Sequence, residues 1–212
     1  MLKIRLIAGI LTVFFLGTLN AQEQEPQQTS EKSVYLKGNA LLIPVGVINV
    51  GLEHQLNKKF TVQGDVLISP WKSFAGHELQ YYSVSLEGRY YFDEAFKHWY
   101  IGGNIAGSRF IAQKWNYWSD GTFIDEKNGN VYQYSDIYQK GYSIILGITG
   151  GYQFKLAENW NMDIYAGIGT SQDFYKGYVR STGARYDVAE GFNKSGEILP
   201  YRGGVMISYK LK

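Results

Sequence analysis

The chain contains no cysteine. A disulfide framework, a zinc site built from thiolates, a cysteine nucleophile and a bacterial lipoprotein anchor are therefore all excluded. Proline is also scarce, at 4 of 212 residues, whereas glycine reaches 25 residues and aromatic residues make up 16% of the sequence. This balance favours β-structure over helix.

A long apolar run is missing as well. The run Leu6–Leu16 is too short for a membrane-spanning helix, which needs about 20 apolar residues. Lys3 and Arg5 precede this run and Ala21 follows it, an order typical of a cleaved signal peptide. We therefore predict a signal peptide, a disordered lead-in and a single β-barrel domain, at residues 1–21, 22–32 and 33–212.

Neither acidic nor basic residues are in large excess. The whole chain has 21 basic and 19 acidic residues, and two of the basic residues lie in the predicted signal peptide. The mature chain is then neutral, so a nucleic-acid partner has no electrostatic basis.

Alternation of apolar and polar residues runs through the remaining sequence. It is clearest in Tyr142–Ile168, where two alternating runs flank a polar turn at Lys155–Asn159. Such alternation indicates strands with one apolar and one polar face. The same pattern predicts eight strands, at about Val34–Ile43, Val47–Leu56, Phe60–Ser69, Leu79–Phe92, Trp99–Ile111, Tyr142–Phe154, Trp160–Ile168 and Leu199–Leu211.

The connections between these strands alternate in length. Short turns are expected at Asn57–Lys59, Asp93–His98 and Lys155–Asn159, and longer loops at Pro70–Glu78, Gln113–Lys140 and Asp173–Glu197. This arrangement is typical of outer-membrane proteins. We predict an all-β fold, an eight-stranded antiparallel up-and-down transmembrane β-barrel of the outer-membrane type. A soluble lipocalin-like barrel or a β-sandwich is the alternative interpretation.

The polar faces of the predicted strands carry several charged residues. Eight strands enclose an interior that side chains just fill, and buried charges are costly unless they are paired. An internal ion-pair network that seals the barrel is therefore predicted, and a gated pore or a proton path is the alternative. The predicted interior polar network consists of Glu53, Asp65, Glu87, Arg89, Asp163 and Arg202.

The longest predicted loop is rich in aromatic residues. They fit the ends of strands that extend above the membrane, where interfacial aromatics are common. They also fit a surface that binds a saccharide or a protein partner. The residues of this predicted loop surface are Trp115, Tyr117, Trp118, Tyr132 and Tyr134.

No catalytic, cofactor or metal site is predicted. His54 and His98 lack a second ligand at metal spacing. His77 lies next to Glu78 and near Ser73, which together offer the residue types of a Ser–His–acid triad. Some eight-stranded barrels are lipid-A-modifying enzymes, but no motif around Ser73 resembles theirs, and we expect no enzyme.

The first three predicted strands carry short motifs. Segment Asn39–Trp71 begins with Asn-x-Leu, continues with Asn-x-Gly-Leu-Glu at Asn49–Glu53 and ends with Pro-Trp. With these motifs the chain resembles a family of uncharacterised small outer-membrane β-barrels, a domain of unknown function, from Bacteroidetes-type bacteria. Tyr90–Phe92 and the closing segment Arg202–Leu211 are also similar in style to this family. The resemblance implies a location and a fold, and it supplies no catalytic residues.

These patterns together predict a protein of the cell outer membrane with a structural role or a surface-binding role through its loops. The expected partners are outer-membrane lipid and lipopolysaccharide, with the barrel-assembly machinery during insertion. A lipid-A-modifying enzyme and a narrow pore for small solutes are the competing functions.

Overall fold

The computed structural model describes residues 32–113, 118–119, 121–125, 129–187 and 191–212. The predicted signal peptide and nearly all of the predicted lead-in lie outside these residues, as do Trp115 and Tyr117. Among the described residues no helix is long and apolar enough to cross a membrane.

Eight of the described strands form one closed antiparallel barrel, in the order β1-β10-β9-β8-β5-β4-β3-β2. Each strand pairs with its neighbour along the chain, and β1 pairs with β10 to close the ring. The predicted all-β fold with eight antiparallel strands is therefore confirmed. The eight strands are β1 (Val34–Asn39), β2 (Ile48–Gln55), β3 (Phe60–Phe74), β4 (His77–Tyr91), β5 (His98–Ala112), β8 (Ile137–Lys155), β9 (Trp160–Val179) and β10 (Asn193–Lys210).

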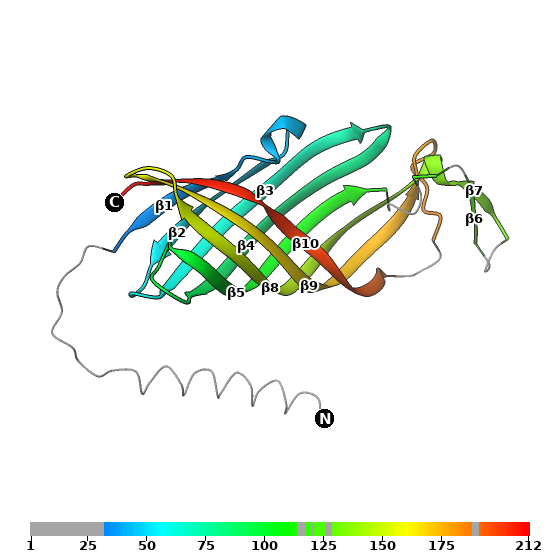
Figure 1. Ribbon diagram of the computed structural model, residues 1–212. Coiled ribbons are helices and arrows are strands. Elements are labelled where there is room, and N and C mark those ends of the chain that lie inside the picture. The colour runs from blue at the N-terminus through cyan, green and yellow to red at the C-terminus, as the bar shows by residue number, and fades with distance from the viewer. Residues whose placement is uncertain (1–31, 114–117, 120, 126–128, 188–190) are drawn as a thin grey trace, which may run out of the picture. The chain divides into compact units, whose positions relative to one another are not determined.

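The two ends of the barrel differ. At the turn end, the β2–β3, β4–β5 and β8–β9 turns lie together with the C-terminus: Ala95 donates its N–H to Lys58 O, and Lys210 donates to Asn159 O, each at 2.8 Å. The loop end carries the β5–β8 and β9–β10 connections. The first of these contains a small hairpin of β6 (Thr122–Ile124) and β7 (Val131–Gln133), seen at the right of Figure 1.

The two faces of the barrel wall differ in chemistry. Along β8, Ile144, Leu146 and Ile148 point outward and are 48%, 53% and 58% exposed. Their neighbours Ser143 and Thr149 point inward and are 5% and 2% exposed. This alternation follows from the two-residue period of a strand, and it places polar side chains inside the barrel and apolar ones outside.

Several strands are longer or shorter than the sequence pattern predicts. β3 and β4 meet at a tight turn, Ala75-Gly76, so the predicted loop Pro70–Glu78 is wrong. β8, β9 and β10 likewise extend into the two predicted long loops. The backbone pairs continue beyond the apolar band, where apolar residues such as Ile137 and Ile198 occur on both faces and alternation no longer marks a strand. β1 instead stops at Asn39, and the chain enters the short 3-10 helix η1 (Ile43–Val45) rather than continuing as strand to Ile43.

A bulge in β10 changes the side to which its first half faces. Strict alternation along Leu199–Leu211 predicts that Leu199 and Tyr201 face outward with Val205. In the structure Pro200 pairs with Ile168 and Arg202 with Gly167, so Tyr201 is the extra residue of a β-bulge. Leu199 and Tyr201 therefore line the interior, as does Arg202.

Candidate functional site

Arg89 lies at the centre of a buried ion-pair network in the turn half of the barrel. Its Nη1 donates to Asp163 Oδ2 at 2.8 Å and to Glu53 Oε2 at 3.2 Å, and its Nε donates to Glu87 Oε1 at 2.9 Å. Lys37 Nζ contacts the same Glu53 and Asp163 oxygens at 2.7 Å and 2.8 Å. All five of these side chains are 0% exposed.

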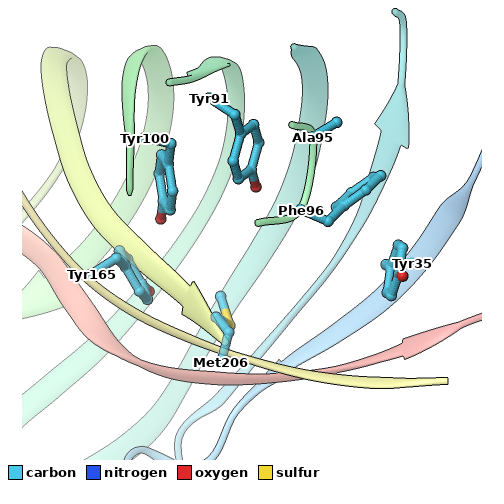
Figure 2. Close-up of a cluster of buried hydrophobic side chains, with 7 residues drawn as sticks. All are labelled: Tyr35, Tyr91, Ala95, Phe96, Tyr100, Tyr165 and Met206. Atoms are coloured by element: carbon cyan, nitrogen blue, oxygen red, sulfur yellow. The ribbon is translucent and has the colours of Figure 1, made fainter. Parts of the chain in front are cut away.

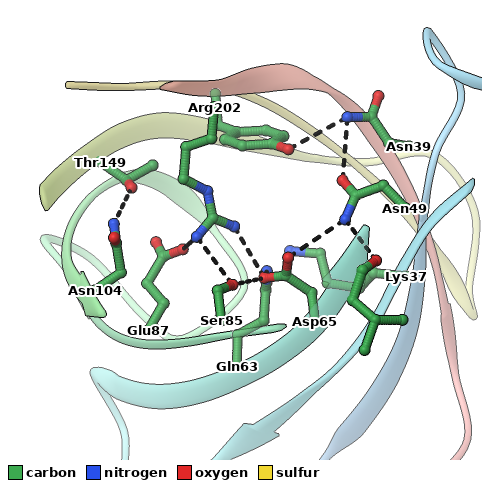
Figure 3. Close-up of polar contacts among 12 residues, drawn as sticks. Lys37, Asn39, Asn49, Gln63, Asp65, Ser85, Glu87, Asn104, Thr149 and Arg202 are labelled. Carbon is green, nitrogen blue, oxygen red and sulfur yellow. Dashed lines mark hydrogen bonds and ion pairs between the residues drawn. The ribbon is translucent and has the colours of Figure 1, made fainter. Parts of the chain in front are cut away.

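Arg202 extends this network toward the loop end. Its Nη2 contacts Asp65 Oδ2 at 2.9 Å and its Nη1 contacts Glu87 Oε2 at 3.1 Å (Figure 3). Ser85 Oγ donates to Asp65 at 2.7 Å. Because Glu87 accepts from both arginines, one continuous chain of ion pairs runs from Lys37 on β1 to Arg202 on β10.

Hydroxyl groups satisfy the remaining carboxylate oxygens. Tyr91 donates to Glu53 Oε1 at 2.8 Å, Thr61 donates to the same oxygen at 2.6 Å, and Tyr100 donates to Asp163 Oδ1 at 2.9 Å. Burying charge in a low-dielectric interior is costly unless each charge is paired and hydrogen-bonded. The network meets that condition and fills this part of the interior with fixed polar groups.

The structure brings all six residues of the predicted interior network together. The predicted network lacks Lys37, which forms ion pairs with two of the four carboxylates from a strand of only six residues. It also lacks the tyrosine hydroxyls. The available signal for Lys37 was its position two residues from Tyr35 and Asn39, because all three share the inward face of β1.

An aromatic cluster closes the interior at the turn end. Figure 2 shows its seven members, contributed by the strands around the ring and by the β4–β5 turn: Tyr35, Tyr91, Ala95, Phe96, Tyr100, Tyr165 and Met206. The Phe96 ring lies 4.4 Å from that of Tyr35, and Phe96 is only 6% exposed. It is folded inward by a φ of 68°, a costly conformation for a residue with a side chain.

On the exposed side of the turn, the hydrogen bond that Lys97 donates to Glu94 raises the pKa of the lysine above its ordinary value.

Small residues on the inner wall make room for the network. A Cβ added at Gly102 on β5 would lie 2.5 Å from Glu87 Oε1. The next residue, Gly103, faces outward and has no atom within 4 Å of the same added atom. The inner glycine is thus required by the close approach of the carboxylate.

The loop half of the interior is hollow. A cavity of about 510 Å³ is lined from β4, β5, β8, β9 and β10, and a smaller one of about 220 Å³ shares Tyr81, Ile145 and Tyr201 with it and reaches Arg202. Within the larger cavity, the Asp173 carboxylate accepts hydrogen bonds from three serines, Ser143, Ser171 and Ser195. We call this space the loop-end cavity.

The predicted loop aromatics do not form one surface among the described residues. Tyr132 and Tyr134 pack with Phe123 against a buried cluster of Ile137, Val179 and Tyr186. Gln139 lines the loop-end cavity and donates to Tyr186 at 2.8 Å, so this cluster adjoins the cavity. Trp118 instead stacks on His77, with ring centres 4.6 Å apart.

His77, the one histidine with a conceivable catalytic neighbourhood, contacts an amide. Its Nδ1 lies 3.0 Å from Gln113 Oε1, and Ser73 on β3 is exposed. Within the described part of the chain, no group of three or more His, Asp or Glu residues is arranged to hold a metal ion.

Comparison with known proteins gives one match. The model of a family described as "Protein of unknown function (DUF3575)" matches residues 10–211. No curated protein and no solved structure matches the chain.

Proposed function

The chain belongs to this family of unknown function (DUF3575), and we propose that it is a small outer-membrane β-barrel with a sealed interior and a non-catalytic, surface-binding role. The family description assigns no activity, so the proposal rests on the chemistry of the barrel wall and of the interior.

The observation that carries the proposal is the inside-out distribution of side chains. Glu53, Arg89 and Asp163 are buried, whereas large apolar side chains cover the outside. Monomeric soluble proteins rarely expose apolar patches larger than a few hundred Å². A lipocalin-like barrel or a β-sandwich would bury this face. The exposed apolar residues include Leu36, Ile48, Val50, Leu52, Val84, Leu86, Ile101, Ile105, Ile144, Leu146, Ile148, Ile164 and Ile168.

Aromatic side chains flank this apolar band, as expected at a membrane interface. Near the turn end, Trp99 packs on Tyr152 at 5.0 Å between ring centres, and Trp160 packs on Tyr209 at 4.9 Å. Trp99 is 62% exposed on the outer wall, which an interfacial anchor accounts for.

The interior supports a sealed barrel rather than a pore. Eight-stranded barrels are narrow enough for side chains to fill, and here ion pairs fill the turn half below an aromatic cap. The arginine and carboxylate groups are held by direct contacts from four or more strands. These fixed contacts favour a structural network over a proton path.

Detergent dependence tests the membrane proposal. The mature chain is expected to fold only with detergent or lipid, and to migrate differently on a gel before and after heating. Planar-bilayer recordings of the folded protein are expected to stay silent. Recovery of folded, monodisperse protein from a detergent-free cell wash would contradict membrane insertion, and stable single-channel steps would contradict the sealed interior.

The loop-end cavity favours a second candidate function, the binding of a small saccharide. It combines tyrosine rings, such as Tyr81 and Tyr201, with the Asp173 carboxylate and its serine hydroxyls. Aromatic faces and hydrogen-bonding carboxylates together suit a polyhydroxylated ligand. Saturation-transfer NMR with a panel of neutral disaccharides tests this. Asp136→Asn is the control, because the Asp136 carboxylate contacts Ser181 outside the lining of the cavity. Binding is expected in the parent barrel and in this control, and is expected to be lost in Asp173→Asn.

A further inference from the structure

Four cationic side chains lie together on the outer wall at the loop end. They are Arg109 on β5, Lys140 on β8, Lys176 on β9 and Lys194 on β10. Each has the outward parity of its strand: Lys140, for instance, lies two residues from Tyr142 and four from Ile144, both exposed. Within the described residues, none of the four forms an ion pair with a carboxylate. We call them the basic patch.

Strand register makes these cations direct neighbours. Lys140 pairs with Lys176 across β8 and β9. Arg109 pairs with Tyr142, which sets it diagonal to Lys140, and Lys194 pairs with Phe174, which sets it diagonal to Lys176. Directly opposite side chains have Cβ atoms about 4.5–5.5 Å apart, and like charges there are destabilising. An anion lying between them would turn this repulsion into attraction.

Aromatic rings lie among the cations of the basic patch. Tyr142 and Phe174 stack with ring centres 5.0 Å apart, and Phe192 lies edge-on to Tyr142 at 5.7 Å. Lys176 Nζ lies 4.8 Å from the centre of the Phe192 ring, and Lys194 Nζ lies 6.0 Å from that of Phe174. The rings hold the ammonium groups in place without neutralising them.

The depth of the basic patch corresponds to a lipid headgroup layer. Along β8 the outward residues pass from Ile144 through Tyr142 to Lys140. Four residues span roughly 13 Å along a strand, or about 10 Å along the barrel axis at the usual tilt. The headgroup region begins at the edge of the hydrocarbon core and is roughly 5–8 Å thick on each side. Flexible lysine side chains at this height reach lipid phosphates.

Resting on the membrane location proposed above, we infer that the basic patch binds the phosphate groups of an anionic phosphorylated lipid in the leaflet at the loop end. The apolar wall contacts the acyl chains, and the rings of Tyr142, Phe174 and Phe192 lie at the interface. The four cations bind the phosphates. A single phosphate between Lys140 and Lys176 neutralises the like-charge pair. The ligand is a lipid headgroup and not free phosphate, because the basic patch is continuous with the apolar wall.

The test compares parent barrel, Lys140→Gln/Lys176→Gln and a control of equal charge change, Lys72→Gln/Lys155→Gln, whose lysines lie exposed elsewhere on the wall. Each is folded into phosphatidylcholine vesicles under four conditions. The vesicles contain bisphosphorylated lipid A, contain its dephosphorylated form, have no addition, or have no addition but are suspended in inorganic phosphate. The measurements are the urea midpoint of unfolding and the amount of lipid retained in native mass spectrometry.

Bisphosphorylated lipid A is expected to raise the midpoint of the parent and control barrels, while the dephosphorylated lipid and inorganic phosphate leave it unchanged. Loss of two lysines is expected to weaken retention roughly thirtyfold, since each basic residue near an anionic surface contributes about a factor of five to ten. Equal retention by the Lys140/Lys176 variant, or an equal shift with dephosphorylated lipid or inorganic phosphate, would overturn the inference. Failure of all variants to insert into phosphatidylcholine would instead contradict the membrane location.

Discussion

Replacing Arg89 with methionine is the most direct test of the interior network. The guanidinium group contacts Glu53, Glu87 and Asp163 and is 0% exposed. Methionine retains much of the aliphatic volume but leaves carboxylates without their shared partner. Removing one member of a buried ion pair costs about 3–5 kcal/mol, a large part of the roughly 5–15 kcal/mol that stabilises a domain.

The matched control is Arg109→Met on the neighbouring strand. Arg109 is exposed on the outer wall, and none of the described carboxylates pairs with it. Its replacement is expected to change the free energy of unfolding by less than about 0.5 kcal/mol in zwitterionic micelles. Urea titration followed by the fluorescence of Trp99 and Trp160 provides the measurement.

A second substitution identifies the cause of the loss. After Arg89→Met, four buried carboxylates share two cations, Lys37 and Arg202. Adding Glu87→Gln lowers this excess of negative charge by one, so part of the lost stability is expected to return. The Glu87→Gln change alone is expected to be destabilising, because Arg89 and Arg202 both lose an ion pair. If Arg89→Met costs less than about 1 kcal/mol, or no more than its control, the network does not stabilise the closed barrel.

Three further predictions follow from the packing and the outer wall. Gly102→Ala is expected to lower the free energy of unfolding by about 1–3 kcal/mol, because its methyl group would lie 2.5 Å from a carboxylate oxygen of Glu87. The control Gly103→Ala is expected to be nearly neutral, and equal urea midpoints for the two variants would refute this prediction. In micelles, Phe96→Ala is expected to lower the free energy of unfolding by about 3 kcal/mol. Phe92→Ala, at a 59% exposed position, is expected to lower it much less. The reverse order would show that the Phe96 ring does not cap the interior. Leu146→Arg is expected to cost about 2–4 kcal/mol in vesicles, and an unchanged midpoint there would remove β8 from the lipid face.

The sequence predicts much of the barrel because a strand has a fixed two-residue period. Once the apolar face is assigned, residues such as Glu53, Arg89 and Asp163 must share the opposite face. Charges confined to one face of a narrow barrel must pair, whatever the details of their geometry. Six charged members of the interior network are therefore predictable from the sequence, whereas Lys37, the tyrosine hydroxyls and the individual contacts are not.

Other features leave no periodic signal. The bulge at Tyr201 adds one residue between two runs that each alternate normally, and nothing in either run marks the shift. The inward fold of Phe96 depends on a positive φ that its residue type does not favour. The strand ends beside the turn at Ala75-Gly76 mix polar and aromatic residues without alternation, so the sequence there looks like a loop. The lining of the loop-end cavity depends on the first of these features, because the bulge places Tyr201 in it.

The connectivity of the ion pairs has a consequence for the order of folding events. Lys37 reaches Asp163 across 126 positions of the chain, and Arg202 reaches Asp65 across 137. Contacts between such distant segments form after the local hairpins, because the entropy of closing long loops must be overcome first. Where the rate-limiting step precedes ring closure, the network is absent from its transition state. Weakening the network is then expected to accelerate opening of the barrel and to leave the rate of assembly nearly unchanged, so the ion pairs would slow the opening of a ring that has already formed.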